Sequence, residues 1–214
     1  MKPQMNADER NYLRPFAAAI VFVLLIVMHS AMADDKEHAR ATFAGGCFWC
    51  MEPPYDKVEG VIETVSGFSG GHVENPTYDQ VVRGGTGHLE VVQVVYDPEK
   101  VDYGQLLEIY WRNVDPFDGG GQFCDRGESY RPAIFVHDDE QSEQAHASLE
   151  ALESSGRFDQ PFAVTIEPFE AFYAAEDYHQ DYYRKNSVRY KYYRWSCGRD
   201  QRLEAIWGDT AAEN

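Results

Sequence analysis

Residues 41–50 are Ala-Thr-Phe-Ala-Gly-Gly-Cys-Phe-Trp-Cys, the most informative stretch of the chain. The first four residues predict a short strand. The two glycines predict a tight turn, because glycine adopts backbone conformations that other residues avoid. A helix is expected to begin near Cys47 and to continue to Gly60, limited by Pro53 and Pro54. A cysteine at a helix start feels unpaired N–H groups and the positive end of the helix dipole, which stabilise a thiolate.

Cys47 and Cys50 form a C-x-x-C pair, which suits redox or metal chemistry better than a structural crosslink. Two more cysteines, Cys124 and Cys197, lie far away in the sequence. Four cysteines in an oxidising compartment usually form two structural disulfides, but the C-x-x-C spacing argues against that simple pairing. A reactive thiolate next to two large aromatic residues predicts a nucleophile beside an apolar pocket. The competing interpretation is a buried cysteine among core aromatic rings.

Outside this segment, strands and helices alternate without a regular βαβ rhythm. Strands are predicted over residues 61–68, 88–96, 131–137 and 162–169, and helices over 103–112, 138–155 and 174–185. Residues 115–128 are expected to form a long Gly-rich loop, and residues 187–196 an inserted, loosely packed stretch. This order predicts a single mixed α+β domain of two layers.

The first 33 residues do not resemble a globular domain. Basic residues precede an apolar run from Pro15 to Met28, which leads to an Ala-x-Ala site ending at Ala33. This pattern predicts a secretory signal over 1–33 and a mature domain over 34–214. An uncleaved anchor is the alternative, although the run is shorter than the roughly 20 residues that span a bilayer. The expected location is therefore the periplasm, or a membrane-anchored position facing the same compartment.

The chain is strongly acidic, with 19 basic against 36 acidic residues and a formal net charge of −17 at pH 7. Without residues 1–33 the charge is close to −18. Such an excess argues against nucleic acid as a partner, because nucleic acid needs a basic surface. The histidines His72, His88 and His179 lack metal-ligand spacing and are expected to be structural hydrogen-bonders. We expect a monomer with no metal and no other cofactor.

Gly46-Cys47-Phe48-Trp49 resembles the signature of the A-type peptide-methionine sulfoxide reductases. Seven further blocks match that family in order, at residues 67–71, 75–78, 87–90, 96–98, 125–127 with 130–131, 175–180 and 197–198. The resemblance covers about residues 41 to 198. It implies a ferredoxin-like core and an enzyme that reduces methionine S-sulfoxide, free or in peptides and proteins.

The resemblance also implies the roles of individual residues. Cys47 is the implied nucleophile and Glu90 the acid that protonates the sulfoxide oxygen. Glu90 must then stay protonated at neutral pH, which implies a desolvated position and a raised pKa. Without the resemblance, a solvated Glu90 is the more ordinary expectation. The other implied site residues form a polar cradle (Tyr78, Asp125 and Tyr130) and an apolar pocket for the S-methyl group (Phe48 and Trp49).

Attack by Cys47 leaves a sulfenic acid, which a second thiol must condense to a disulfide. Cys197 matches the C-terminal resolving position of the family and is favoured for this role. Cys50 is a rival, at a position where many members have glycine, and Cys124 is a third candidate. A thioredoxin-like partner would then reduce the disulfide. Two other interpretations stay open: a general thiol–disulfide oxidoreductase, and a four-cysteine zinc module.

Overall fold

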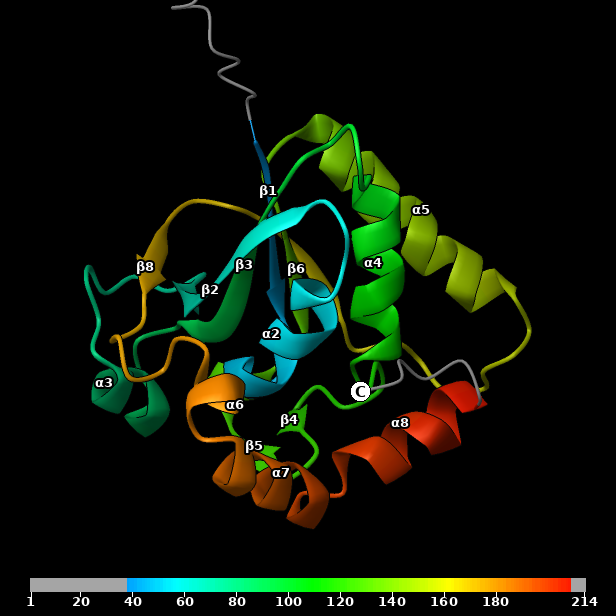
Figure 1. Cartoon of the computed structure of the whole chain (residues 1–214). Helices are drawn as coiled ribbons and strands as arrows, with labels where there is room; N and C mark the ends of the chain where they lie inside the picture. The colour runs from blue at the N-terminus through cyan, green and yellow to red at the C-terminus, as the bar shows by residue number, and fades with distance from the viewer. Residues whose placement is uncertain (1–37, 209–214) are drawn as a thin grey trace, which may run out of the picture. The chain divides into compact units, whose positions relative to one another are not determined.

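The computed structural model describes residues 38–208, which form a mixed sheet with its longer helices packed against it (Figure 1). The predicted signal over residues 1–33 lies outside this described part. Within residues 38–208, none of the helices combines the length and the apolar character needed to cross a bilayer.

The centre of the sheet follows a βαββαβ order. Its elements are β1 (Ala39–Ala44), α2 (Phe48–Asp56), β2 (Val61–Ser69), β3 (Leu89–Tyr96), α4 (Tyr103–Arg112) and β6 (Ala133–Val136). β3 pairs antiparallel with β1 and β2, and β1 also pairs antiparallel with β6. The resulting order β6-β1-β3-β2 is the ferredoxin-like arrangement. The predicted α+β fold class is confirmed.

Two short strands extend the sheet at its edges: β7 (Thr165–Pro168) lies parallel to β6, and β8 (Phe172–Ala174) antiparallel to β2. A small separate hairpin joins β4 (Gly121–Gln122) to β5 (Asp125–Arg126) inside the predicted Gly-rich loop. The remaining elements are α3 (Tyr78–Arg83), the 3-10 helix η1 (Glu128–Tyr130), α5 (Asp139–Ser154), α6 (Tyr182–Lys185), α7 (Ser187–Ser196) and α8 (Arg199–Trp207).

The main core lies between the sheet and helices α2 and α4. Phe43 from β1, Val92 from β3 and Met51 from α2 are fully buried there. Helix α4 contributes a buried stripe at helical spacing, and a capping box between Asp102 and Gln105 fixes its start. Helix α5 packs alongside α4 (Figure 1). The two helices therefore support the sheet whose strands carry the candidate site.

The central predictions are confirmed close to their expected bounds, but two C-terminal predictions are wrong. Residues 174–185 do not form one helix. Ala175 N donates to Ser66 O at 2.9 Å, which continues the β8 pairing, and Asp181 adopts a left-handed φ of 53° just before the short α6. Residues 187–196 are not a loose insertion, because they form α7 with Tyr190 and Arg194 buried. Helices α3 and α8 had no counterpart in the prediction.

Candidate active site

The turn after β1 places Cys47 at the start of α2. Gly46 has φ +79°, and a Cβ added there would lie 2.5 Å from Gln122 Cβ, so the position needs glycine for two reasons. Cys47 is the N-cap of α2, as the sequence predicts. The helix runs through Pro53 and Pro54 and ends at Asp56, before the expected end at Gly60.

Cys47 and Cys50 are free thiols, buried in the same environment with 6% and 1% of their surface exposed. Burial raises the pKa of Cys47 well above its ordinary value. A hydrogen bond from Cys47 lowers the pKa of Cys50 to about 6. The opposite directions of the two shifts favour the proton on the Cys47 sulfur and negative charge on the Cys50 sulfur. The two sulfur atoms share one proton.

Two buried arginines from the C-terminal helices support the thiolate. Arg199 and Arg194 both lower the pKa of Cys50 by their positive charge. Arg199, only 1% exposed, donates to Asn113 O at 2.6 Å and to Gly45 O at 3.2 Å. It is therefore fixed to the backbone of the turn that carries Cys47. In the sequence, Arg199 is a single arginine after Cys-Gly, and nothing near it indicates that it lies beside Cys50.

Glu90 lies on β3 beneath the start of α2 and is 1% exposed. Its Oε2 accepts the backbone N–H of Phe48 at 3.1 Å. Desolvation raises the pKa of Glu90 to about 8, although the Phe48 hydrogen bond opposes that shift. Burial thus acts in the direction that the resemblance implies, and it favours a neutral Glu90 carboxyl that can donate a proton near neutral pH.

The three residues of the implied polar cradle come together around Glu90. Burial raises the pKa of both Tyr78 and Tyr130, and the charge of the nearby Glu90 adds to both shifts. Desolvation also raises the pKa of Asp125, whose charge acts on Cys47, Cys50 and Glu90. Near neutral pH, this group can therefore offer neutral hydrogen-bond donors to an oxygen atom beside Cys47.

Phe48 and Trp49 lie in an aromatic cluster next to the thiols. Phe48 is buried, with its ring centroid 6.0 Å from Phe68 and 6.2 Å from Tyr78. Trp49 stacks on Tyr182 at 3.7 Å and is only partly buried. These contacts form an apolar aromatic wall beside the two thiols.

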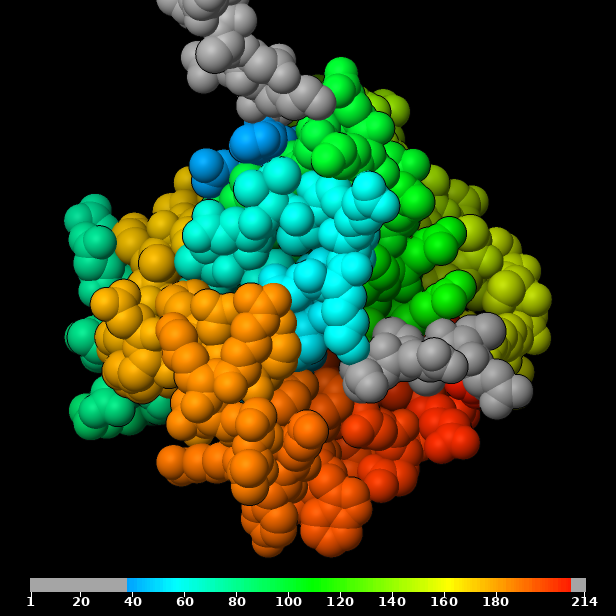
Figure 2. Space-filling model, viewed as in Figure 1, coloured from blue at the N-terminus to red at the C-terminus, as the bar shows by residue number. Residues whose placement is uncertain are grey.

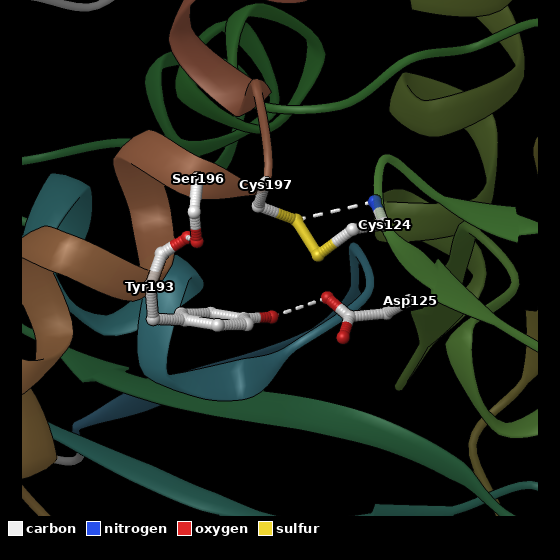
Figure 3. Close-up of a disulfide and its surroundings, with 5 residues drawn as sticks. All are labelled: Cys124, Asp125, Tyr193, Ser196 and Cys197. Carbon is white, nitrogen blue, oxygen red and sulfur yellow. Dashed lines mark hydrogen bonds between the residues drawn. A yellow bond between two sulfur atoms is a disulfide. The ribbon is translucent and has the colours of Figure 1, made fainter.

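The C-terminal cysteine is not a free thiol. Cys197 forms a disulfide with Cys124, with Cα atoms 5.0 Å apart, and Cys124 is exposed (Figure 3). The sequence analysis favours Cys197 as the thiol that attacks the Cys47 sulfenic acid. In the structure the Cys197 sulfur is part of a disulfide and is not a thiol. Cys50 is the thiol hydrogen-bonded to Cys47. The disulfide joins the end of α7 to the β4–β5 turn.

Tyr193 on α7 completes the site, and the sequence analysis did not single it out. Its hydroxyl donates to Asp125 Oδ2 (Figure 3), while its ring packs in the cluster that contains Cys50. One signal could have pointed to it, namely the density of tyrosines before Cys197. That density did not indicate which tyrosine faces inward.

Of the three histidines expected to be structural hydrogen-bonders, His88 and His179 have such side-chain partners. The His88 ring lies between two backbone groups. Its Nε2 atom is 2.8 Å from Val73 O, and its Nδ1 atom accepts from Gly71 N at 3.1 Å. His179 Nδ1 accepts from Trp49 Nε1 at 3.1 Å and so fixes the indole. In the described residues, Cys124, Asp125 and Cys197 bring possible metal-ligand atoms within 4.8 Å of one another. Because both sulfurs are in a disulfide, that group offers no thiolate ligand.

Comparison with known proteins agrees with this chemistry. Residues 39–211 match the family described as "Peptide methionine sulfoxide reductase". The MsrA protein of Bacillus licheniformis is 51% identical over 83% of this chain and 97% of its own length. The MsrA/MsrB protein of Vibrio cholerae is 52% identical over 82% of this chain, which spans about half (47%) of that protein. The solved structure of reduced Mxr1 from Saccharomyces cerevisiae is 32% identical, with a TM-score of 0.65 over 72% of this chain and 88% of that one.

Proposed function

The chain belongs to the peptide methionine sulfoxide reductase family and reduces methionine sulfoxide, and we propose that Cys47 is the residue that attacks the sulfoxide. The observation that carries this proposal is the position of three buried groups together at the start of α2: the free thiols of Cys47 and Cys50, and the Glu90 carboxyl that accepts from Phe48 N. Sulfoxide reduction needs a nucleophilic sulfur on one side of the substrate and an acid on the oxygen. The cluster supplies both.

The first step begins when the sulfoxide oxygen enters the polar cradle. Glu90 donates its proton to that oxygen, and the Tyr78 and Tyr130 hydroxyls hydrogen-bond to it. Cys47 gives its proton to the Cys50 thiolate and its sulfur takes the oxygen from the substrate. The S–O bond of the substrate breaks, methionine leaves, and Cys47 becomes a sulfenic acid. Glu90 regains a proton from solvent before the next cycle.

Cys50, now a thiol, then resolves the sulfenic acid. It lies one helical turn from Cys47 and already hydrogen-bonds with it, and C-x-x-C spacing allows a disulfide. Condensation forms the Cys47–Cys50 disulfide and releases water. We assign the resolving step to Cys50, and not to Cys197, because Cys50 is the free thiol in contact with Cys47.

A single-turnover experiment tests these assignments. Pre-reduced protein is freed of reductant, mixed with methionine sulfoxide and analysed for methionine and for cysteine state by mass spectrometry. Cys47→Ser should release no methionine. Cys50→Ser should release methionine and keep a sulfenic acid on Cys47 that dimedone traps. Methionine release by Cys47→Ser would remove Cys47 from the mechanism, and a normal Cys47 disulfide in Cys50→Ser would remove Cys50.

We further propose that the protein acts outside the cytoplasm. The basic and apolar leader with its Ala-x-Ala site supports export, and the Cys124–Cys197 disulfide is typical of an oxidising compartment. Mass spectrometry of the protein from fractionated cells tests this. An N-terminus at Asp34 in the periplasmic fraction is expected, whereas an intact Met1 in the cytoplasmic fraction would contradict it.

A further inference from the structure

Strand β2 has an outer edge that the sheet covers only in part. β8 pairs with β2 from Gly67 to Ser69 and not beyond. Within residues 38–208, no other strand lies on that side of β2. An open strand edge presents backbone N–H and C=O groups to which a second extended chain can pair. The part of β2 before Gly67 is therefore a place where such a chain can add to the sheet.

At Ser66 the side chain of Gln180 takes the place of a neighbouring strand. Gln180 Oε1 accepts from Ser66 N, and Gln180 Nε2 donates to Ser66 O, both at 2.9 Å. Ala175 N also donates to Ser66 O at 2.9 Å. Alternate residues of a strand direct their backbone polar groups to the same side, so the N–H and C=O of Thr64 face the same edge as those of Ser66. Thr64 is thus the first open hydrogen-bonding position beyond the end of this ladder.

A groove of about 430 Å³ lies beside this open edge. Residues 61–65 of β2 line one side of it, and residues between 174 and 184 line the other; we call it the β2 groove. In Figure 2 the surface of β2, in cyan, lies next to that of residues 174–184, in gold and orange. Ile62, at the lining, is 54% exposed. The β2 groove can therefore receive both the backbone and the side chains of an extended segment.

The β2 groove is acidic, because four carboxyl groups and a single guanidinium group line it. Arg184 pairs with Asp56 at 3.1 Å and with Asp181 at 2.9 Å. The other two acids, Glu63 and Asp177, are exposed, and neither forms an ion pair within residues 38–208. A basic segment complements these two carboxylates, whereas an acidic segment is repelled by them.

One end of the β2 groove is built from residues that also support the aromatic wall of the active site. Ala175 lines the groove and packs in one buried cluster with Phe48. Gln180 follows His179, whose ring accepts from Trp49 Nε1 at 3.1 Å. An extended chain advances about 3.3 Å per residue. A polypeptide whose methionine sulfoxide lies against this wall can therefore enter the groove a few residues further along its chain.

From these observations, and resting on the function proposed above, we propose that the β2 groove is a docking site for an extended, basic segment of the oxidised polypeptide substrate. The backbone of that segment pairs with Thr64, and its Lys or Arg side chains contact Glu63 and Asp177. The segment lies a few residues away from the methionine sulfoxide that Cys47 reduces. The protein therefore favours oxidised polypeptides that carry basic residues near the sulfoxide.

Two matched peptides test the role of charge. Each holds one methionine sulfoxide between two extended segments of about eight residues, enough to cover the groove on either side. The segments carry lysines in one peptide and glutamates in the other. The kcat/KM for the Lys peptide should exceed that for the Glu peptide about tenfold, as two exposed ion pairs allow, and high salt should reduce the difference.

Free methionine sulfoxide, which is too small to reach the groove, is the reference substrate. Equal kcat/KM values for the two peptides, in a protein that reduces the free amino acid, would overturn the docking site. Failure to reduce all three substrates would instead refute the proposed function.

Charge reversal in the groove gives a second readout. The Glu63→Lys/Asp177→Lys double variant should favour the Glu peptide over the Lys peptide and reduce free methionine sulfoxide at the wild-type rate. The matched control, Glu150→Lys/Glu153→Lys, makes the same change in charge at exposed positions of α5, outside the groove. It should keep the wild-type preference. The same change of preference in both double variants would show an effect of net charge and contradict the site.

Thr64→Pro tests the backbone pairing. Proline removes the N–H that faces the open edge, and the pairing with β3 is kept because that N–H points away from β3. The matched control is Thr64→Val, which keeps the N–H but, like proline, loses the hydroxyl that donates to Asp56 Oδ1 at 2.7 Å. Thr64→Pro should raise the KM for the Lys peptide about fivefold, the effect of one lost hydrogen bond. Thr64→Val should not, and equal KM values in the two variants would reject the pairing.

Methylated peptides test the same pairing in the wild-type protein, without any risk to its folding. Two forms of the Lys peptide carry N-methyl groups on alternate backbone amides, one form on each alternate set. Because only one set can face β2, one form should bind more weakly than the other. The same KM for both forms would show that the segment does not pair as a strand.

Discussion

The backbone N–H of Phe48 donates to Glu90 Oε2 at 3.1 Å, so that the residue next to Cys47 holds the buried acid in place. The hydrogen bond engages one carboxyl oxygen and leaves the other for the substrate. It also joins Glu90 on strand β3 to Phe48 at the start of α2, although the two residues are 42 positions apart in sequence. In the proposed mechanism, the properties of Glu90 therefore control the first chemical step.

Glu90→Gln should slow sulfenic acid formation by roughly two to four orders of magnitude, the usual contribution of general acid catalysis. The glutamine amide still hydrogen-bonds but cannot deliver a proton. Rapid-quench measurement of methionine release gives the rate. Glu63→Gln, an exposed carboxyl on the neighbouring strand β2, is the control and should react normally. A normal rate in Glu90→Gln would remove Glu90 from the mechanism as the acid.

The pH profile of kcat/KM should be bell-shaped, with limbs near pH 6 and pH 8. Below about pH 6 a proton occupies Cys50, whose pKa is about 6, and Cys50 then cannot accept the Cys47 proton. Above about pH 8 Glu90, whose pKa is raised to about 8, loses the proton that the sulfoxide oxygen needs. Glu90→Gln should lose the alkaline limb. A wild-type profile flat from pH 5 to pH 10 would rule out both groups.

The substrate should be consumed with complete preference for the S epimer of methionine sulfoxide. The A-type resemblance implies this choice. A site that holds methyl, oxygen and lone pair by separate groups must in any case be chiral. Chiral chromatography of a racemic substrate after exhaustive reaction measures how much of each epimer is left. Equal loss of the two epimers would contradict the assignment of the cradle.

Glu52 makes a prediction about stability. It is buried on α2, accepts from Ser66 Oγ at 2.7 Å, and has Oε2 without a hydrogen-bond partner. Desolvation raises its pKa to about 7, above the ordinary value of 4.5. The folded state therefore binds a proton that the unfolded state has lost, so this group's contribution to stability falls as pH rises from about 4.5 through 7.

Between pH 6 and pH 8, this single carboxyl should cost wild-type protein about 1 kcal/mol of unfolding free energy. Glu52→Gln cannot ionise and should lose correspondingly less, which corresponds to a Tm difference of about 2–4 °C at pH 8. Thermal unfolding at the two pH values measures both proteins. Equal losses in wild type and Glu52→Gln would show that Glu52 does not titrate in this range.

Local sequence determined much of the fold and the identity of the reacting groups. The Gly-Gly turn before Cys47, the Val-rich strand that carries Glu90 and the apolar stripe of residues 103–112 each depend on neighbours within a few positions. The matching blocks also indicated the cradle residues and the family. Because turn preference and side-chain periodicity act over such short ranges, they can be recognised without a structure.

The state of those groups was decided only by the tertiary structure. Cys124 and Cys197 are 73 residues apart, and nothing in their local sequence pairs them. In the sequence, Tyr193 is one of several neighbouring tyrosines. Only the position of α7 brings its ring into the Cys50 cluster and its hydroxyl to Asp125. The pKa shifts of Cys47 and Glu90 depend on burial, and that of Cys50 depends also on Arg194 and Arg199 from the far end of the chain. Desolvation and charge act through space, so segments distant in sequence set the chemistry of Cys47.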